Sequence, residues 1–250
     1  MEAIVLALRA EHRELDIMLN GLTQPEWERP SRCPGWPVSD VVLHLAQTDE
    51  LTLASVTGRF SDAFGALSEG AVAAVDIDTA AALAVERERG PVGVAVRDRW
   101  RAAADAVAQM FEGCGPSSRV VWVAGELSVR TLAATRLSET WIHSGDIAQA
   151  LGRELPVTDR LWHIARLAWR TLPYAFARSR QELRGPVAVY LDAPDGSIWS
   201  FEADSAMTTV RGPALDFCLV AGRRLAPAMS SLEADGSDAH AVLELLRTYA

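Results

Sequence analysis

The sequence predicts a mainly α protein in two parts, a helical bundle over residues 1–155 and a smaller α+β domain over residues 156–250. The first part contains four long regions in which apolar residues recur at helical spacing. After Pro156 the pattern changes to one further helix, followed by short segments that suit strands. The 250 residues exceed the commonest domain size, so each part can bury a core of its own.

The bundle region opens with an amphipathic helix that ends near Asn20. A segment rich in proline and glycine, residues 23–37, separates it from a second helix, for which Ser39 or Asp40 is a suitable N-cap. A strand-like stretch over residues 118–124 precedes the last helix of the bundle. The expected helices are 3–22, 39–60, a stretch after Gly70 that is interrupted at Gly90-Pro91 and reaches about Glu112, and 128–151 with its stop at Gly152.

The second region begins with a helix over about 159–178. Residues 186–191 and 198–202 are typical of strands, and the Asp195-Gly196 pair between them is typical of a tight turn. We therefore expect a β-hairpin at this point of the chain. Two more helices, about 215–225 and 238–249, complete a small α+β domain.

The charge and composition of the chain exclude several classes of function. The net charge is −9, and no stretch concentrates arginines into a stripe that would neutralise phosphates, so nucleic acid is not expected as a partner. All 24 basic residues are arginine, which excludes Schiff-base chemistry and a P-loop lysine. Three widely spaced cysteines suit a reducing compartment, and no apolar run approaches the ~18 residues of a membrane span. A soluble, cytoplasmic protein without structural disulfides is expected.

Glu139 and His143 are spaced so that they can share a ligand on one face of the last bundle helix. Such pairs are common on solvated helix faces, but apolar residues surround this one, and a buried carboxylate needs a partner or a metal. His44 lies among the apolar positions of the second helix and can supply a third donor, although taken alone it is typical of a core histidine. Two histidines and one carboxylate form a metal site that keeps an open position, as catalytic sites do.

Two segments resemble the mycothiol-dependent maleylpyruvate isomerase family, which is part of the DinB-like metalloprotein superfamily. The first is residues 33–45, CPGWPVSDVVLHL, preceded by PEW at 25–27. The second is residues 136–148, RLSETWIHSGDIA, and Gly152 follows where the family also places glycine. The match in order and spacing extends through the bundle. Cys33 can lie near the metal of such a site, and a buried cysteine without a role is the simpler alternative.

The resemblance implies a DinB-like four-helix bundle in which His44, Glu139 and His143 bind one divalent metal ion, zinc in preference to nickel or iron. It also implies a small C-terminal domain similar to a sterol-carrier fold. In that domain Arg223 resembles an arginine that helps to hold an anionic substrate or thiol, and Arg224 beside it is an alternative. The implied cosubstrate is mycothiol, a low-molecular-weight thiol, and the implied substrate is a small anionic or carbonyl-containing molecule.

Helical geometry places further residues near this site. Asp146 stands three residues after His143 and can accept its ring N–H, although a surface pair is an equal alternative at this spacing. Gln47 and Thr48 lie one turn after the histidine of the second helix, and we expect them to line the same cavity. Asp49, the next residue, is expected to face solvent or the mouth of the cavity.

Three functions are open from the sequence. The first is an isomerase or thiol transferase, in which a thiolate adds to a conjugated double bond, permits rotation and then leaves, as the family resemblance implies. The second is a thiol-independent isomerase, lyase or cyclase that acts on a natural-product intermediate with the metal as Lewis acid. The third is a non-catalytic metal-containing protein that holds an apolar ligand in its C-terminal domain. The sequence contains no GxSxG, Gly-rich phosphate-loop or HExxH motif in support of another enzyme class.

Overall fold

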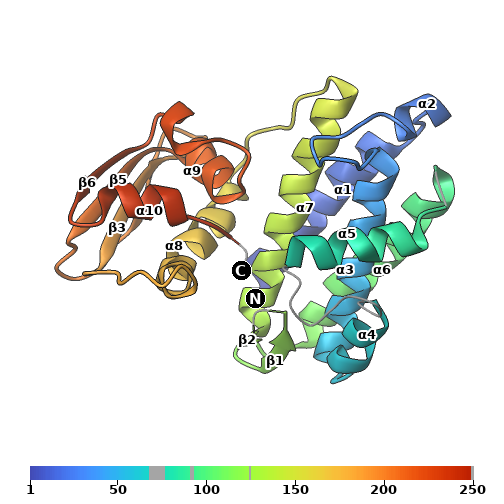
Figure 1. Ribbon diagram of the computed structural model, residues 1–250, viewed down its shortest axis with the longest axis horizontal. Helices are drawn as coiled ribbons and strands as arrows, with labels where there is room; N and C mark the ends of the chain where they lie inside the picture. The colour runs from blue at the N-terminus through green and yellow to red at the C-terminus, as the bar shows by residue number, and fades with distance from the viewer. Residues whose placement is uncertain (68–76, 91–92, 124, 249–250) are drawn as a thin grey trace. The chain divides into compact units, whose positions relative to one another are not determined.

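The computed structural model describes residues 1–67, 77–90, 93–123 and 125–248. The chain forms two compact units, Met1–Leu155 and Pro156–Ala250. The first unit is almost entirely helical, and the second combines helices with a sheet (Figure 1). The predicted fold class, a helical bundle followed by an α+β part, is therefore confirmed. Within the described ranges, no helix is both long enough and apolar enough to span a bilayer.

Four long helices build the bundle of the first unit, as the ribbon in Figure 1 illustrates. They are α1 (Glu2–Leu19), α3 (Val38–Val56), α6 (Val94–Gly113) and α7 (Val129–Leu151). Helix α1 packs against α6 and α7, and α3 packs against the same two helices, so the four surround one core. Leu43, Trp100 and Leu137 are among the apolar side chains buried in it. Removal of this apolar surface from water is the main favourable contribution to the stability of the bundle.

The ends of α7 follow the sequence signals, whereas the start of α3 does not. The hydroxyl of Ser128 accepts a hydrogen bond of 3.1 Å from a backbone N–H of the first turn, and Gly152 ends the helix in the left-handed conformation. The prediction that Ser39 or Asp40 caps α3 is wrong, because the helix begins earlier, with Pro37 as its N-cap. Both predicted cap residues are buried within the first turn of the helix.

Shorter elements connect the long helices. The expected second helix ends at Val56 and not near Phe60, and the helix α4 that begins at Phe60 was not predicted. The interrupted third stretch forms the separate helices α5 and α6, and the strand-like segment pairs with an unforeseen partner in an antiparallel hairpin. These elements are α2 (Gln24–Trp27), α4 (Phe60–Leu67), α5 (Ile77–Glu88), β1 (Arg119–Trp122) and β2 (Gly125–Ser128). Three predicted positions lie outside the described residues, namely the helix breaks at Gly70 and Pro91 and the strand end at Ala124.

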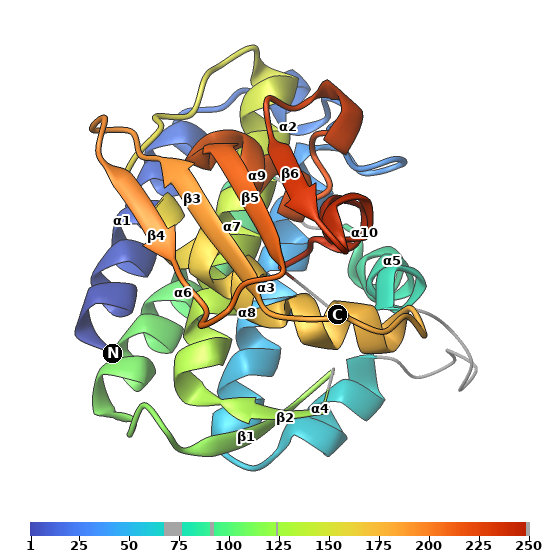
Figure 2. The same ribbon diagram turned by 90° about the vertical axis from the view of Figure 1, so that its left-hand side faces the viewer.

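The second unit contains a sheet in the order β4-β3-β5-β6 (Figure 2). Strands β3 and β5 are parallel, and each edge strand is antiparallel to its neighbour. Helix α8 packs against β4, α9 against β3 and β5, and α10 against β5 and β6. The elements are α8 (Leu161–Arg178), β3 (Val187–Asp192), β4 (Ile198–Phe201), β5 (Thr208–Pro213), α9 (Ala214–Ala221), a 3-10 turn (Pro227–Met229), β6 (Glu233–Gly236) and α10 (Ala239–Leu245).

The predicted β-hairpin of the second unit is confirmed as β3 and β4. Its turn contains Gly196 with a φ of 84°, a left-handed conformation that glycine adopts without strain. Strands β5 and β6 were not predicted, and they complete the sheet on the other side of β3. The last helix ends at Leu245, and the predicted end at Tyr249 lies outside the described residues.

Candidate metal centre

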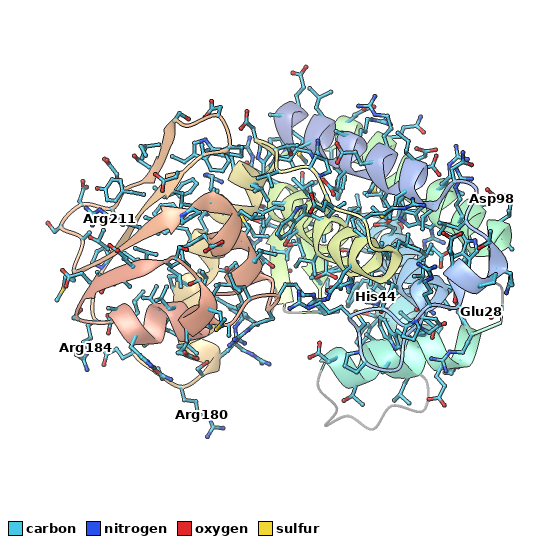
Figure 3. The ribbon with its side chains drawn as sticks, turned by 90° about the horizontal axis from the view of Figure 1, so that it is seen from above. Glu28, His44, Asp98, Arg180, Arg184 and Arg211 are labelled. Carbon is cyan, nitrogen blue, oxygen red and sulfur yellow. The ribbon has the colours of Figure 1, made fainter. Side chains whose placement is uncertain are left out.

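Three potential metal ligands come together between α3 and α7. His44 lies on α3, inside the bundle, whereas Glu28 and Asp98 are exposed residues at its edge (Figure 3). Glu139 and His143 lie four residues apart on α7, so their side chains leave the same face of the helix on successive turns. Helices α3 and α7 are in contact. The structure thus brings together the three residues that the sequence singled out.

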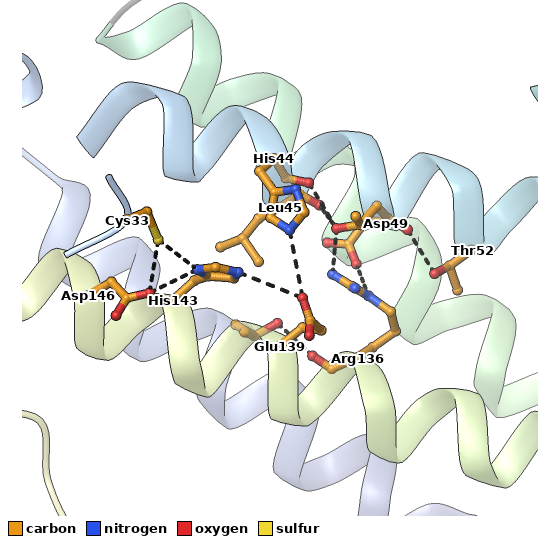
Figure 4. A network of polar contacts seen from close by, with 11 residues as sticks. Cys33, His44, Leu45, Asp49, Thr52, Arg136, Glu139, His143 and Asp146 are labelled. Atoms are coloured by element: carbon orange, nitrogen blue, oxygen red, sulfur yellow. Dashed lines mark hydrogen bonds and ion pairs between the residues drawn. The ribbon is translucent and has the colours of Figure 1, made fainter. Parts of the chain in front are cut away.

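The donor atoms of the three side chains converge on a small volume (Figure 4). The Nε2 atoms of His44 and of His143 each lie 3.7 Å from the same oxygen, Oε2 of Glu139. The two imidazole rings lie with their centroids 5.0 Å apart, and all three candidate ligand atoms lie within 4.8 Å of one another. The side chains are 10%, 19% and 10% exposed for His44, Glu139 and His143, so the cluster is largely but not completely closed.

This donor set fits a divalent ion such as zinc. Zinc–nitrogen and zinc–oxygen bonds of about 2.0–2.2 Å place tetrahedral ligand atoms about 3.4 Å apart. The two separations of 3.7 Å exceed this value by only a few tenths of an ångström, which small side-chain movements can remove. Two imidazoles and one carboxylate would leave a fourth position for an exchangeable ligand.

Asp146 and Cys33 lie on the other side of the His143 ring. Oδ2 of Asp146 is 3.0 Å from Nδ1 of His143, and the thiol of Cys33 donates to the same oxygen at 3.3 Å. When this ring is neutral and its Nδ1–H donates to a carboxylate, the lone pair of Nε2 points in the opposite direction, toward Glu139. The structure therefore places Asp146 where the sequence predicted it, with Cys33 as an additional partner.

The three candidate ligands differ in their pKa shifts. For Glu139, burial alone would raise the pKa, but the contact with His44 and the positive charges of His143 and Arg136 lower it to about 2. Burial lowers the pKa of His44, in part opposed by Glu139. Burial would also lower the pKa of His143, but hydrogen bonds with Asp146 and Cys33 raise it to about 9. Near neutral pH the ion-free cluster thus holds its proton on His143.

Metal binding at about pH 7 is expected to release about one proton per ion, because a metal binds only the deprotonated imidazole. The proton comes from His143, whose pKa is raised to about 9, whereas Glu139 and His44 are already deprotonated. Apparent zinc affinity should therefore rise about tenfold per pH unit up to about pH 9 and then level off. Chelator competition measured across this range tests the slope, and an affinity independent of pH would contradict the assigned protonation.

A buried ion pair lies one helical turn from the candidate ligands. Nε of Arg136 donates to Oδ1 of Asp49, and its Nη2 donates to the hydroxyl of Thr48, both at 2.9 Å. The side chains of Arg136 and Asp49 are 1% and 0% exposed. The expectation that Asp49 faces solvent is wrong, because the arginine compensates its charge inside the core. Thr48 also donates to the carbonyl of His44 at 2.9 Å, so it belongs to this network.

Gln47 lies in a different network, directed toward α5. Its amide donates to the carbonyl of Ala84 at 2.9 Å and to Oε2 of Glu88 at 3.1 Å. Glu88 also pairs with Arg99, which in turn binds Glu50 at 2.7 Å. These bonds link α3, α5 and α6. They direct the amide nitrogen of Gln47, a residue expected to line the cavity beside His44, toward α5. Gln47 is thus a structural link in this fold.

Arg223 lies in the second unit, two residues after the end of α9. Its φ is 59°, a left-handed conformation that is uncommon for residues other than glycine, and its side chain is exposed. Arg224 is half-buried, and its Nη1 donates to the carbonyl of Gly222 at 3.0 Å. Arg180 and Ser205 adopt the same left-handed conformation, so the conformation assigns no role to Arg223, and anion binding by this residue stays a prediction.

The part of the chain that matches a known protein family contains the whole metal cluster. The family model described as the mycothiol maleylpyruvate isomerase N-terminal domain matches residues 8–148. This range is more than half of the chain, and it includes all three candidate ligands. The chain belongs to the mycothiol maleylpyruvate isomerase family. Two proteins of Mycobacterium tuberculosis described as uncharacterized are each 31% identical to it over 249 residues, 98% of this chain and 95% of theirs. The family predicted from the two sequence segments is confirmed.

Solved structures of the mycothiol-dependent maleylpyruvate isomerase share the fold of this chain. One superimposes with a TM-score of 0.60 at 15% identity and covers 94% of this chain and 93% of the isomerase. A mutant of that enzyme with histidine replaced by alanine gives a TM-score of 0.59 at 16% identity, with 89% of each chain covered. The fold of the mycothiol maleylpyruvate isomerase family therefore extends beyond the matched N-terminal region into the second unit.

Proposed function

We propose that this chain is a metal-dependent isomerase or thiol transferase with mycothiol as its cosubstrate. The observation that carries the proposal is the convergence of His44, Glu139 and His143, whose candidate ligand atoms lie within 4.8 Å of one another. Membership of the mycothiol maleylpyruvate isomerase family supports the class of reaction. The donor set supports a divalent metal, with zinc in preference to nickel or iron, which the same ligands can also bind.

Each residue of the cluster has a defined task in this proposal. His44, Glu139 and His143 hold the ion, and Asp146 fixes the tautomer and the orientation of the His143 ring. A zinc ion with an open position supplies a Lewis acid, which lowers the pKa of a thiol or polarises a carbonyl oxygen. The partial exposure of Glu139, 19% of its side chain, leaves access for a small molecule.

The proposed reaction is a thiol-assisted isomerisation. The mycothiol thiolate adds to a conjugated C=C bond of a small substrate, and the electron pair of the double bond moves to the adjacent carbonyl as an enolate. The resulting single bond rotates, the electron pair returns, and the C–S bond breaks to restore the double bond and the thiolate. No atom is gained or lost.

A cytoplasmic location is part of the proposal, because a thiol cosubstrate needs a reducing compartment and the three cysteines form no disulfide.

The test begins with elemental analysis of the full-length chain purified without a metal-affinity column. Mycothiol is then titrated into metal-loaded protein and into chelator-treated protein, and thermal stability is followed in both. We expect about one ion per chain and mycothiol stabilisation of the loaded form only. A chain that binds no metal on reconstitution would contradict the proposal. Metal without any effect of the thiol would refute the use of mycothiol and indicate direct Lewis-acid catalysis or a non-catalytic site.

Replacing Arg223 by alanine is expected to leave the metal content unchanged and to weaken mycothiol or substrate binding about tenfold, the cost of one charge-assisted hydrogen bond. The residue lies outside the metal cluster and is exposed. Titration of the loaded variant measures the effect, and Arg224→Ala tests the alternative residue. Arg180→Ala, which removes another exposed arginine of the second unit, is the matched control. Equal affinity in Arg223→Ala and the unaltered chain would remove this arginine from the binding site.

A further inference from the structure

The turn that precedes α3 is held in a single conformation by its own hydrogen bonds. Pro30 and Pro37 form an isolated antiparallel bridge at its base. The backbone N–H and the hydroxyl of Ser31 both donate to the carbonyl of Trp36, at 2.9 Å and 2.8 Å. The N–H of Cys33 donates to the Ser31 hydroxyl at 3.1 Å, and the N–H of Trp36 donates to the Cys33 carbonyl at 3.0 Å. The turn thus presents Cys33 and Trp36 in fixed positions.

The side chains of Cys33 and Trp36 approach different histidines of the candidate centre. The Cys33 thiol lies 3.3 Å from Oδ2 of Asp146, the same oxygen that is 3.0 Å from Nδ1 of His143 (Figure 4). The ring of Trp36 lies with its centroid 5.2 Å from that of His44, at an interplanar angle of 45°. The same turn therefore contacts the ring of His44 and the carboxylate beside His143, although the two histidines lie on different helices.

Cys33 is on the wrong side of His143 to bind the same ion as His44 and Glu139. Its sulfur lies 3.8 Å from Nδ1, whereas Nε2 of the same ring faces Glu139 at 3.7 Å. The sulfur, Asp146 and Nδ1 also form a compact group of possible ligands. An ion bound there in addition to one on Nε2 would need both ring nitrogens of His143 deprotonated, and it would replace the 3.0 Å hydrogen bond. A thiol that donates to the carboxylate requires neither change.

We propose that the 30–37 turn positions both histidine ligands of the metal centre, with Cys33 acting on His143 through Asp146 and Trp36 acting directly on the His44 ring. This inference rests on the metal centre of the proposed function. The thiol restrains the carboxylate that orients His143, and the indole limits rotation of the His44 ring. Both side chains are positioning residues, and neither touches the ion.

The test measures metal affinity and the cobalt(II) absorption spectrum of the full-length chain, neither of which requires the substrate. Cys33→Ala removes the donor to Asp146, and we expect an affinity about tenfold lower, as for other groups behind metal ligands. The cobalt bands should shift because the ligand geometry relaxes. Cys33→Ser restores an O–H donor and should recover most of the affinity. Cys114→Ala is the matched control, since Cys114 is also half-buried and lies elsewhere in the first unit.

Trp36→Leu provides a second variant that leaves the thiol in place. It should lower metal affinity and shift the cobalt bands by way of His44, independently of Cys33. If the unaltered chain binds no metal, both the proposed function and this inference fail. If it binds metal and the Cys33 and Trp36 variants match it in affinity and spectrum, only the positioning role fails. A second ion per chain that Cys33→Ala abolishes would make Cys33 a ligand and would also overturn this role.

Discussion

Replacement of either His44 or His143 by alanine is expected to abolish zinc retention, and with it any activity that depends on the ion. Each change removes one of three protein donors, so the loss should exceed the ~10–100-fold caused by changes to groups behind a ligand. Helix content should be retained, because alanine is the best helix former and the apolar neighbours of both residues still fill the core. Elemental analysis after dialysis and far-UV circular dichroism measure the two effects.

The matched control is His240→Ala, because His240 is an exposed histidine of the second unit. It belongs to no potential ligand cluster within the described residues, and the variant should keep its full metal content. Glu139→Gln keeps the size of the third side chain but removes its charge, so it should also weaken zinc binding strongly. Stoichiometric metal in both alanine variants would show that the ligand assignment is wrong.

The comparison of His44 with His12 shows what the sequence could and could not predict about the site. Both histidines lie on buried faces of long helices. His12 contacts Trp100 edge-on at 5.9 Å, and its pKa is lowered to about 3, chiefly by burial, so it is a neutral core residue. His44 differs because α7 presents Glu139 opposite it. Helical periodicity cannot show which helices face one another, so the family resemblance was needed to predict this meeting.

The wrong prediction that Asp49 faces solvent has a related physical cause. Charged side chains are rarely buried without a partner, so a sequence alone favours an exposed position for an aspartate on a helix. Arg136, the partner that makes burial tolerable, lies far away in the sequence on another helix. Two of the unforeseen strands, β2 and β6, are short, and neither shows an alternating apolar pattern. Their pairing with neighbouring strands, and not local propensity, decides their conformation.

Asp49→Ala is expected to destabilise the bundle by about 3–5 kcal/mol, because it leaves the Arg136 guanidinium buried without its counter-charge. The pair links α3 to α7, the two helices that carry the candidate ligands. Chemical denaturation of the ion-free chain gives the change in free energy of unfolding without a contribution from metal binding. A loss below about 1 kcal/mol would contradict the buried environment of this pair.

The exposed pair between Arg9 and Glu112 is the matched control. It also joins two long helices of the bundle, α1 and α6, at 2.9 Å, but its side chains are 36% and 54% exposed. Arg9→Ala should cost less than about 1 kcal/mol, because water replaces the lost contact. The difference between the two single variants then measures the effect of burial on an ion pair of similar geometry.

A double variant, Asp49→Leu with Arg136→Met, tests whether the bundle requires this particular ion pair or only requires that no buried charge is left unpaired. It removes both charges together and should regain most of the stability lost in Asp49→Ala, because no unpaired charge remains in the core. Since the opposite charges of the pair are removed together, the net charge near the ligands is unchanged, and zinc affinity should change little if α3 and α7 keep their register. Recovered stability with weak zinc binding would show that the pair aligns the two helices for the ligands. A double variant as unstable as Asp49→Ala would show instead that the bundle requires the hydrogen bonds of Arg136 themselves.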